Sequence, residues 1–372
     1  MMEPNARTHP PARPPYPGPA SAPQEPPQEL PQEVPAVRRA APRGQAAGPP
    51  ADATEPLVDR AEPRVDPASA DRAGRWLLGE LDRGNWRAAR GLLDRTLDPD
   101  DRYFYVSLCA NRPGRPDWLD EWAAAEPDAG TPLLVRGAQA ITWAWEARGG
   151  GRVEETPPAA FRAFWERLEL AEGDLREAAA RNPHDPTPPA FLVTSCRGLE
   201  LGLEELADRF KEVIARHPWH RGAHSQMVQG LSDKWGGSHT LMLNFAREAA
   251  AGSPGGGGVA AVVAEAHIEC YLAIEDRRRR EGYFEAPEII DELHRAADWS
   301  VRHPAWHPRP GWQREHNLFA FCFAMGDDHR AALHHFQAVD GLVTVDPWQS
   351  VHGDPVHAFT ALRDRSAQLV RD

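Results

Sequence analysis

The sequence predicts an all-α protein, built as an array of antiparallel helix pairs behind a proline-rich leader. After residue 69 the apolar residues recur at intervals of three and four, which is the period of an amphipathic helix. Convincing strand-like alternation is hard to find. A spaced set of small and large apolar residues also recurs about every 35 residues, which is typical of a helical repeat.

Residues 1 to 68 form the predicted leader. This segment holds 18 of the 37 prolines of the 372-residue chain, and Tyr16 is its only aromatic residue. Because so little apolar area cannot offset the entropy lost on ordering, we expect the leader to be disordered. Pro-Gln-Glu recurs at a period of four from Pro23, Pro27 and Pro31, which favours an extended spacer. The alternatives are a docking site for a proline-reading domain and a coding start placed too far upstream.

The helical body is expected to span residues 69 to 372, with residues 69 to 150 as a candidate N-terminal subdomain. Two short amphipathic helices, ADRAGRWLLGELDRG and NWRAARGLLDRTL, are separated at Gly84. A third, PLLVRGAQAITWAWEARGGG, ends at the glycines after Arg148. Helices are expected to end at such glycines because glycine loses the most backbone freedom inside a helix.

The repeat places apolar residues at relative positions 0, 4 and 7 and a proline at position 12. Residues at these spacings share one helix face, so we expect them to pack in the core. The three close copies are Ala171, Leu175, Ala178 and Pro183; Leu206, Phe210, Val213 and Pro218; and Met242, Ala246, Ala249 and Pro254. The weaker copies are Ala296, Trp299 and Pro304; Ala89, Leu93 and Thr96; and Ala332, Phe336 and Val339.

This spacing resembles the second helix of a tetratricopeptide repeat. The stretches GNWRAARGLL at 84–93 and GDDHRAALHHF at 326–336 are similar to that family's turn between helices. The family's first-helix signature is mostly missing, although Gly230 stands where its small residue would be. The resemblance implies an α-solenoid, in which the first helices of successive pairs line a groove for a protein or peptide partner.

The stretch DKWGGSH joins two predicted helices and allows two interpretations. As a corner, Gly236 and Gly237 would adopt the left-handed backbone that ends a helix, Ser238 would cap the next helix, and Trp235 would pack over the turn. As a site, Lys234 and the free N–H groups of the second helix would form an anion pocket.

The same stretch carries a second resemblance. The Lys-Trp-Gly-Gly-Ser sequence is similar to a signature shared by a group of uncharacterised bacterial, actinobacterial-type proteins, which form a domain family of unknown function. This resemblance implies a shared fold and no particular activity.

The composition argues against several partners. The net charge is -13, and nucleic acid is not expected because its binding depends on clustered positive charge. The longest apolar run, residues 259 to 274, contains Glu265, His267 and Glu269, so it is too charged to span a membrane. The four scattered cysteines and the lack of a secretory signal predict a cytoplasmic protein with reduced thiols.

We therefore expect a non-enzymatic scaffold or adaptor that binds a protein or peptide, without catalytic residues, metal or cofactor. The residues expected near its groove are Arg197, His224, Gln226, Lys234, Trp235, His316 and Asn317.

The alternative is an enzyme or metal-binding protein that uses the C-terminal half, because 15 of the 16 histidines follow residue 183. His220 and His224 are four residues apart on a predicted helix, but a zinc site needs a third protein ligand. His267 is expected to be a hydrogen-bonded core histidine, whereas His334 and His335 are expected to be solvated. The four arginines at 277–280 are expected to end a helix and to be exposed.

Overall fold

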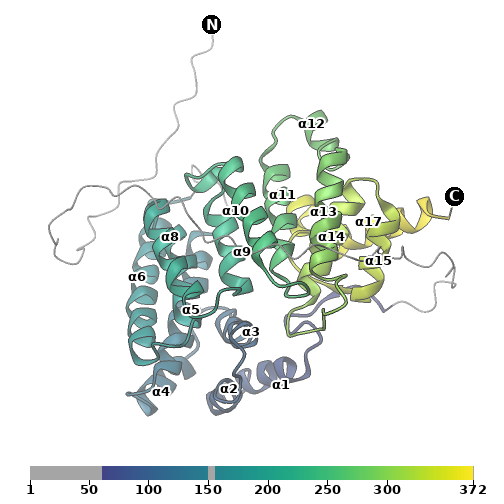
Figure 1. Cartoon of the computed structure of the whole chain (residues 1–372). Helices are drawn as coiled ribbons and strands as arrows, with labels where there is room; N and C mark the ends of the chain where they lie inside the picture. The colour runs from purple at the N-terminus through teal and green to yellow at the C-terminus, as the bar shows by residue number, and fades with distance from the viewer. Residues whose placement is uncertain (1–60, 150–155, 372) are drawn as a thin grey trace, which may run out of the picture. The chain divides into compact units, whose positions relative to one another are not determined.

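The long elements of this protein are all α-helices (Figure 1). The computed structural model describes residues 61–149 and 156–371, so most of the predicted leader lies outside the described residues. Within the described ranges, the only strands are β1 (Arg64–Val65) and β2 (Leu342–Val343), which pair in parallel. The all-α prediction is confirmed. None of the described helices is long and apolar enough to cross a membrane.

The helices fall into three groups along the chain, where η marks a 3-10 helix. The N-terminal ones are α1 (Arg72–Leu81), α2 (Trp86–Leu93), α3 (Pro99–Ala110), α4 (Trp118–Ala125), α5 (Gly130–Arg148) and α6 (Pro158–Arg181). The central ones are α7 (Thr187–Gly198), α8 (Gly202–Ile214), α9 (Arg221–Gly230), η2 (Asp233–Trp235), α10 (His239–Gly252), η3 (Val259–Ala261) and α11 (Val262–Ala273). The C-terminal ones are α12 (Arg277–Glu281), α13 (Pro287–Trp299), α14 (Gln313–Met325), α15 (His329–Val339), α16 (Gln349–His352) and α17 (Pro355–Leu369).

The predicted helix breaks fall at glycines with a left-handed backbone. Gly84 has a φ of 72° between α1 and α2, and Gly149 has a φ of 73° directly after α5. Glycine adopts this region without the steric penalty of a Cβ atom. The carboxylate of Asp71 accepts the N–H of Gly74 at 2.6 Å and so caps the start of α1.

The repeat positions are core positions. The first three residues of every close copy are buried, and they lie on α6, α8 and α10. Among the weaker copies, Thr96 is partly exposed and 44% of Trp299 is exposed. Trp299 is the last residue of α13, and its indole N–H donates to the carbonyl oxygen of Ser253, 2.8 Å away. Its predicted core position is therefore wrong.

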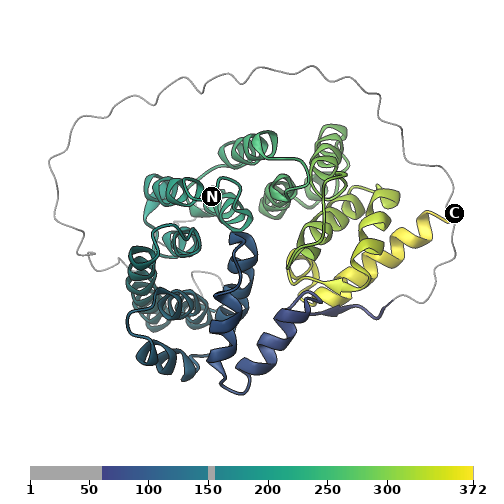
Figure 2. The same ribbon diagram turned by 60° about the horizontal axis from the view of Figure 1, so that its bottom comes forward.

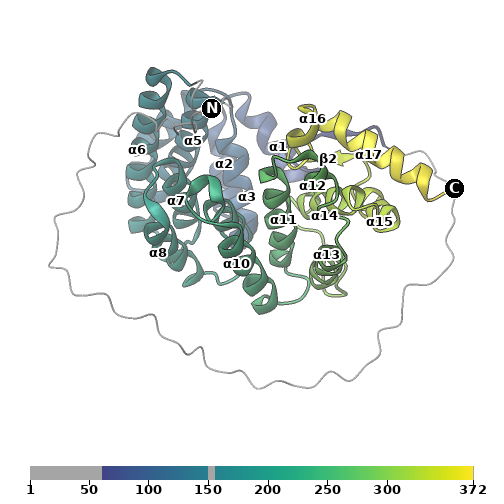
Figure 3. The ribbon, with the colours of Figure 1, turned by 90° about the horizontal axis from the view of Figure 1, so that it is seen from above.

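Successive helices pack against one another along the chain: α5 contacts α6, α7 contacts α8, α9 contacts α10, and α14 contacts α15. Figure 3 shows α6 and α8 on the outer side of α5 and α7, with α3 on the inner side. The apolar core forms two clusters, one from Ala68 to Leu199 and one from Ala190 to Phe359. Both clusters draw residues from α7, and the candidate subdomain therefore shares its core with α6 and α7.

The segment before α3 reaches the last elements of the chain. Strand β1 pairs with β2, and the side-chain amide of Gln313 on α14 donates to the carbonyl oxygen of Ser69 at 2.6 Å. Figure 2 shows α1 and β1 next to the C-terminal helices. The folded unit thus begins at Ala61, before the predicted boundary at residue 69. Further along the chain, α3 itself contacts α5, α7 and α9.

Candidate functional site

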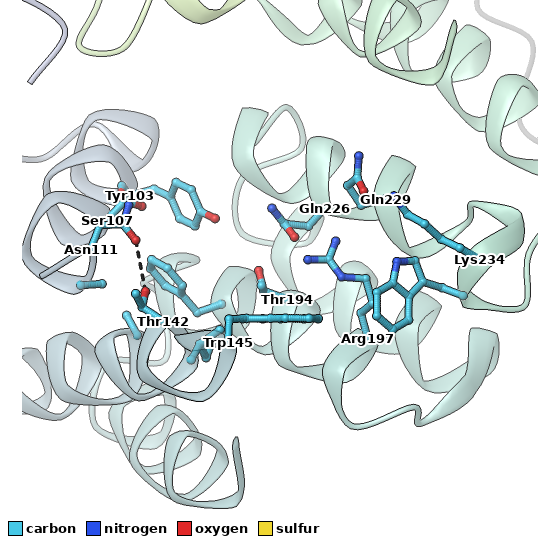
Figure 4. A pocket seen from close by; sticks show the side chains of 15 residues that line it. Tyr103, Ser107, Asn111, Thr142, Trp145, Thr194, Arg197, Gln226, Gln229 and Lys234 are labelled. Carbon is cyan, nitrogen blue, oxygen red and sulfur yellow. Dashed lines mark hydrogen bonds between the residues drawn. The ribbon is translucent and has the colours of Figure 1, made fainter. Parts of the chain in front are cut away.

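A cavity of about 510 Å³ lies where α3 faces α5, α7, α9 and η2 (Figure 4). Ligand pockets in proteins commonly have volumes of this order, combine apolar walls with a few polar groups, and lie between helices of helical folds. The cavity depends on α3 and on α5, α7 and α9, each of which packs against the long helix that follows it in the chain. This arrangement makes it the best candidate for a functional site.

Four aromatic side chains form much of the cavity wall. Tyr103 of α3 stacks on Phe191 of α7, with ring centroids 4.6 Å apart. Trp145 of α5 meets Trp235 of η2 edge to face, with centroids 6.0 Å apart. The wall therefore offers flat apolar surfaces on both sides of the cavity.

Arg197 of α7 lies at the centre of this wall. Its guanidinium carbon is 5.7 Å from the centroid of Trp145 and 5.5 Å from that of Trp235. Its Nε and Nη1 atoms are buried, and no hydrogen-bond partner for them exists among the described residues. Burial lowers the pKa of the guanidinium to about 10, so the side chain is still charged at neutral pH. Arg197 is partly buried, and two buried donors of a cation that have no acceptor are unfavourable unless a partner supplies one.

Three other polar atoms of the cavity are also buried without a partner in the described part of the chain. They are the Oγ1 atom of Thr194, the Oε1 atom of Gln226 and the Nε1 atom of Trp235. Figure 4 shows Gln226 beside the guanidinium of Arg197, and the ring centroid of Trp235 lies 5.5 Å from the guanidinium carbon. The amide oxygen of Gln226, an acceptor, and the indole N–H of Trp235, a donor, thus lie next to the guanidinium of Arg197.

Lys234 is already engaged. Its Nζ atom lies 2.7 Å from a carboxylate oxygen of Glu269, and the other oxygen accepts the amide of Gln229 at 2.6 Å. The positive charge of Lys234 is therefore balanced, whereas that of Arg197 is not.

Four of the seven predicted groove residues line this cavity: Arg197, Gln226, Lys234 and Trp235. Sequence reasoning missed Tyr103 and Phe191 as cavity residues. It also missed Trp145, whose side chain is half-buried and lines the cavity. No local signal in the sequence shows that α3 packs against α5, α7 and α9.

The other three predicted residues lie away from the cavity. His224 is buried against Phe210 and Phe245, and its Nδ1 atom contacts the carbonyl oxygen of His220. His316 and Asn317 are buried in α14, where Asn317 accepts the indole N–H of Trp348 at 2.7 Å. These side chains point into the core.

The Lys-Trp-Gly-Gly-Ser stretch forms a corner. Gly236 has a left-handed φ of 87°, and Trp235 packs against Trp145. The expectation for Gly237 is wrong, since its φ is not positive. A Cβ atom there would lie 2.0 Å from the carbonyl oxygen of Leu231, so close packing excludes a side chain.

Ser238 caps α10, since its hydroxyl accepts the N–H of Leu241 at 3.1 Å. We expect Ser238→Ala to lower the free energy of unfolding by about 1 kcal/mol. Thr240→Ala is the matched control, because Thr240 is an exposed hydroxyl residue in the same helical turn. Urea unfolding compares the two variants. Equal midpoints for both would show that the cap contributes nothing.

Of the histidines in the C-terminal half whose side chains the structure describes, six are buried, and the others are partly buried or exposed. In the described ranges, no three His, Cys, Asp or Glu side chains are grouped to hold a metal ion. His220 caps α9 by accepting the N–H of Ala223 at 3.1 Å. His267 is a hydrogen-bonded core histidine, as predicted, with Nδ1 2.9 Å from the hydroxyl of Tyr283.

One expectation about surface groups is wrong, and another is right only in part. His335 is fully buried against the rings of Phe319 and Phe323, where we expected it to be solvated. The arginines at 277–279 are exposed, as expected, but instead of ending α11 the four arginines form a short helix of their own, α12, which Asp276 caps.

Comparison of the chain with models of known protein families and with curated proteins finds no match. The two resemblances therefore depend on the quoted residues alone, and the geometry of the cavity is the main basis for assigning a function.

Proposed function

We propose that this chain is a non-enzymatic scaffold or adaptor, and that a protein or peptide partner binds in the cavity between α3 and α5, α7 and α9. In this proposal the body is a tetratricopeptide-like array of antiparallel helix pairs. The repeat residues of α6, α8 and α10 pack in the core, while the preceding helix of each pair lines the cavity. This division of roles between helices supports the array.

The observation that carries the proposal is the unpaired guanidinium of Arg197 among aromatic rings. Folding places a charged group where its own chain supplies no acceptor, and a bound partner would supply one. The histidines favoured by the alternative, an enzyme or metal-binding protein, cap helices or contact core residues instead.

We also propose a reducing, cytoplasmic location. All four cysteines are buried as free thiols. Such thiols are typical of compartments in which disulfides are rare. We further propose that the bacterial family with the Lys-Trp-Gly-Gly-Ser signature is related to this chain, because residues 234–238 carry that signature.

A paired tryptophan experiment tests the binding function. The tagged full chain, Trp145→Ala and Trp299→Ala are each used to capture partners from native lysate, and captured proteins are quantified by mass spectrometry. Both tryptophans are partly exposed and lie toward the C-terminal end of a helix, but only Trp145 lines this cavity.

We expect a protein that the wild type and Trp299→Ala retain and that Trp145→Ala loses by about tenfold or more, as for a central interface residue. The melting temperature of each variant confirms that it is folded. Equal capture by the two variants would contradict binding at this cavity.

A further inference from the structure

The charge of the cavity differs from that of the whole chain. The chain carries a net charge of -13, yet the charged residues that line the cavity are Arg197 and Lys234. None of its described lining residues is acidic. Glu269 lies nearby and balances Lys234, which leaves one positive charge in excess, that of Arg197.

One excess charge favours a singly charged group. A carboxylate carries one negative charge and is planar, so it matches the planar guanidinium. A phosphate group carries up to two charges and would need further free cations. Trp235 adds a second free donor through Nε1, and the Oε1 atom of Gln226 can accept one hydrogen bond from the ligand.

The remaining wall favours a flat apolar group beside that carboxylate. The indole of Trp145 and the stacked rings of Tyr103 and Phe191 line the same cavity. Apolar surface placed against them is removed from water, and aromatic rings favour stacked or edge-to-face contacts.

We infer that this cavity binds an organic carboxylate that carries a flat apolar group, with the carboxylate paired to Arg197 and the apolar group against Trp145 and Tyr103. The inference rests on the proposed binding function and names the chemistry of the bound group. That group is either a free acid or the C-terminal residue of the partner, since both present the same carboxylate.

Isothermal titration of the full chain with N-acetyl-phenylalanine tests the inference. N-acetyl-phenylalaninamide is the neutral probe of the same shape, and inorganic phosphate is the competing anion. We expect the acid to bind with a Kd of about 1 mM or tighter, and the amide and phosphate to bind at least about tenfold more weakly. Equal binding of acid and amide, or tighter binding of phosphate, would overturn the inference.

Two arginine variants locate the binding. Arg197→Gln removes the charge, while Arg277→Gln removes the charge of an arginine whose side chain is 90% exposed on α12. Only Arg197→Gln should weaken binding of the acid, by about tenfold or more. If Arg197→Gln fails to fold, Arg197→Lys keeps the charge without the planar fork and should weaken binding as well. Unchanged binding by a folded Arg197 variant would overturn the inference.

A tetrapeptide, acetyl-Ala-Ala-Ala-Phe with a free C-terminus, separates the two sources. If it binds at least as tightly as N-acetyl-phenylalanine, the group is the end of a partner chain. If only the smaller acid binds, the ligand is a free acid. Both results support a carboxylate site. If no acid binds while Trp145→Ala still loses its partner, the carboxylate inference fails and the proposed function stands. If the acid binds but Trp145→Ala keeps its captured protein, the proposed protein partner is rejected and the carboxylate inference stands.

Discussion

Replacing Arg209 by methionine is expected to lower the free energy of unfolding by about 3–5 kcal/mol, because the change removes the buried arginine that pairs with the buried carboxylate of Glu172 and leaves that carboxylate with Arg176, whose side chain is 53% exposed. Arg209 of α8 is 5% exposed and Glu172 of α6 is 2% exposed. The Nη1 and Nη2 atoms of Arg209 donate to the two oxygens of Glu172 at 2.6 and 3.0 Å, and the hydroxyl of Ser195 on α7 donates to the same carboxylate. The pair thus ties three helices together.

Lys211→Met is the matched control for Arg209→Met. Lys211 lies on the same helix and pairs with Asp208, but its side chain is 69% exposed, so its loss should change stability by less than about 1 kcal/mol. The double change Arg209→Met with Glu172→Leu should recover much of the lost stability, since no buried charge remains. Urea unfolding measures all three. An Arg209→Met protein as stable as Lys211→Met would show that the pair is not buried in solution.

Acidification from about pH 6.5 to about pH 4 is expected to destabilise the fold by about 1.4 kcal/mol per pH unit for each buried histidine that stays neutral. Burial lowers the pKa of His220 and of His316 to about 4. Burial also lowers the pKa values of His224 and His335. In the unfolded chain these side chains take up protons near pH 6.5, while in the folded chain they do not. Stability is therefore greatest above pH 6.5 and falls as the pH falls toward 4.

The acidic residue beside His220 acts in a different pH window. Burial tends to raise the pKa of Asp100, but a hydrogen bond from His217 and the charge of Arg221 lower it to about 2. The stability that Asp100 contributes is consequently lost only as the pH falls from its unfolded value, near 4, toward 2. The decline between about pH 6.5 and about pH 5 belongs to the histidines.

Urea unfolding at about pH 7 and about pH 5 measures the histidine effect. Replacing His316 and His335 together by phenylalanine should make the pH dependence shallower, because two of the proton-binding groups are removed. His239→Gln, an exposed position, is the control and should leave it unchanged. Equal stability at the two pH values would contradict the buried, neutral state of these histidines.

Local features of this fold are visible in the sequence because they depend on neighbouring residues. The breaks at Gly84 and Gly149, the core stripe through Leu175 and the cap at Ser238 each follow from spacing or from one residue's backbone preference. The same kind of reasoning placed Trp235 in the corner, where it packs against Trp145.

Features that depend on contacts between residues far apart in the sequence cannot be predicted from local sequence patterns. The position of α3 is held by contacts such as the N–H of Arg221 with the carboxylate of Asp100, which are 121 residues apart. Helical periodicity does not show which side chains of a helix face a cavity. Trp145 and His316 both lie on helices, but Trp145 is half-buried and lines the cavity, whereas His316 is buried in the core. The partnership of Arg209 with Glu172 is hidden for the same reason.

The side-chain Nε–Hε signal of Arg197 in a nitrogen–proton NMR spectrum reports directly on the cavity. Its assignment comes from the signal's disappearance in Arg197→Gln. The Nε atom has no partner in the described structure, so addition of N-acetyl-phenylalanine should shift this signal downfield and saturably, while N-acetyl-phenylalaninamide should leave it in place. An Arg197 signal that stays unchanged while the acid is bound would contradict a binding site at this arginine.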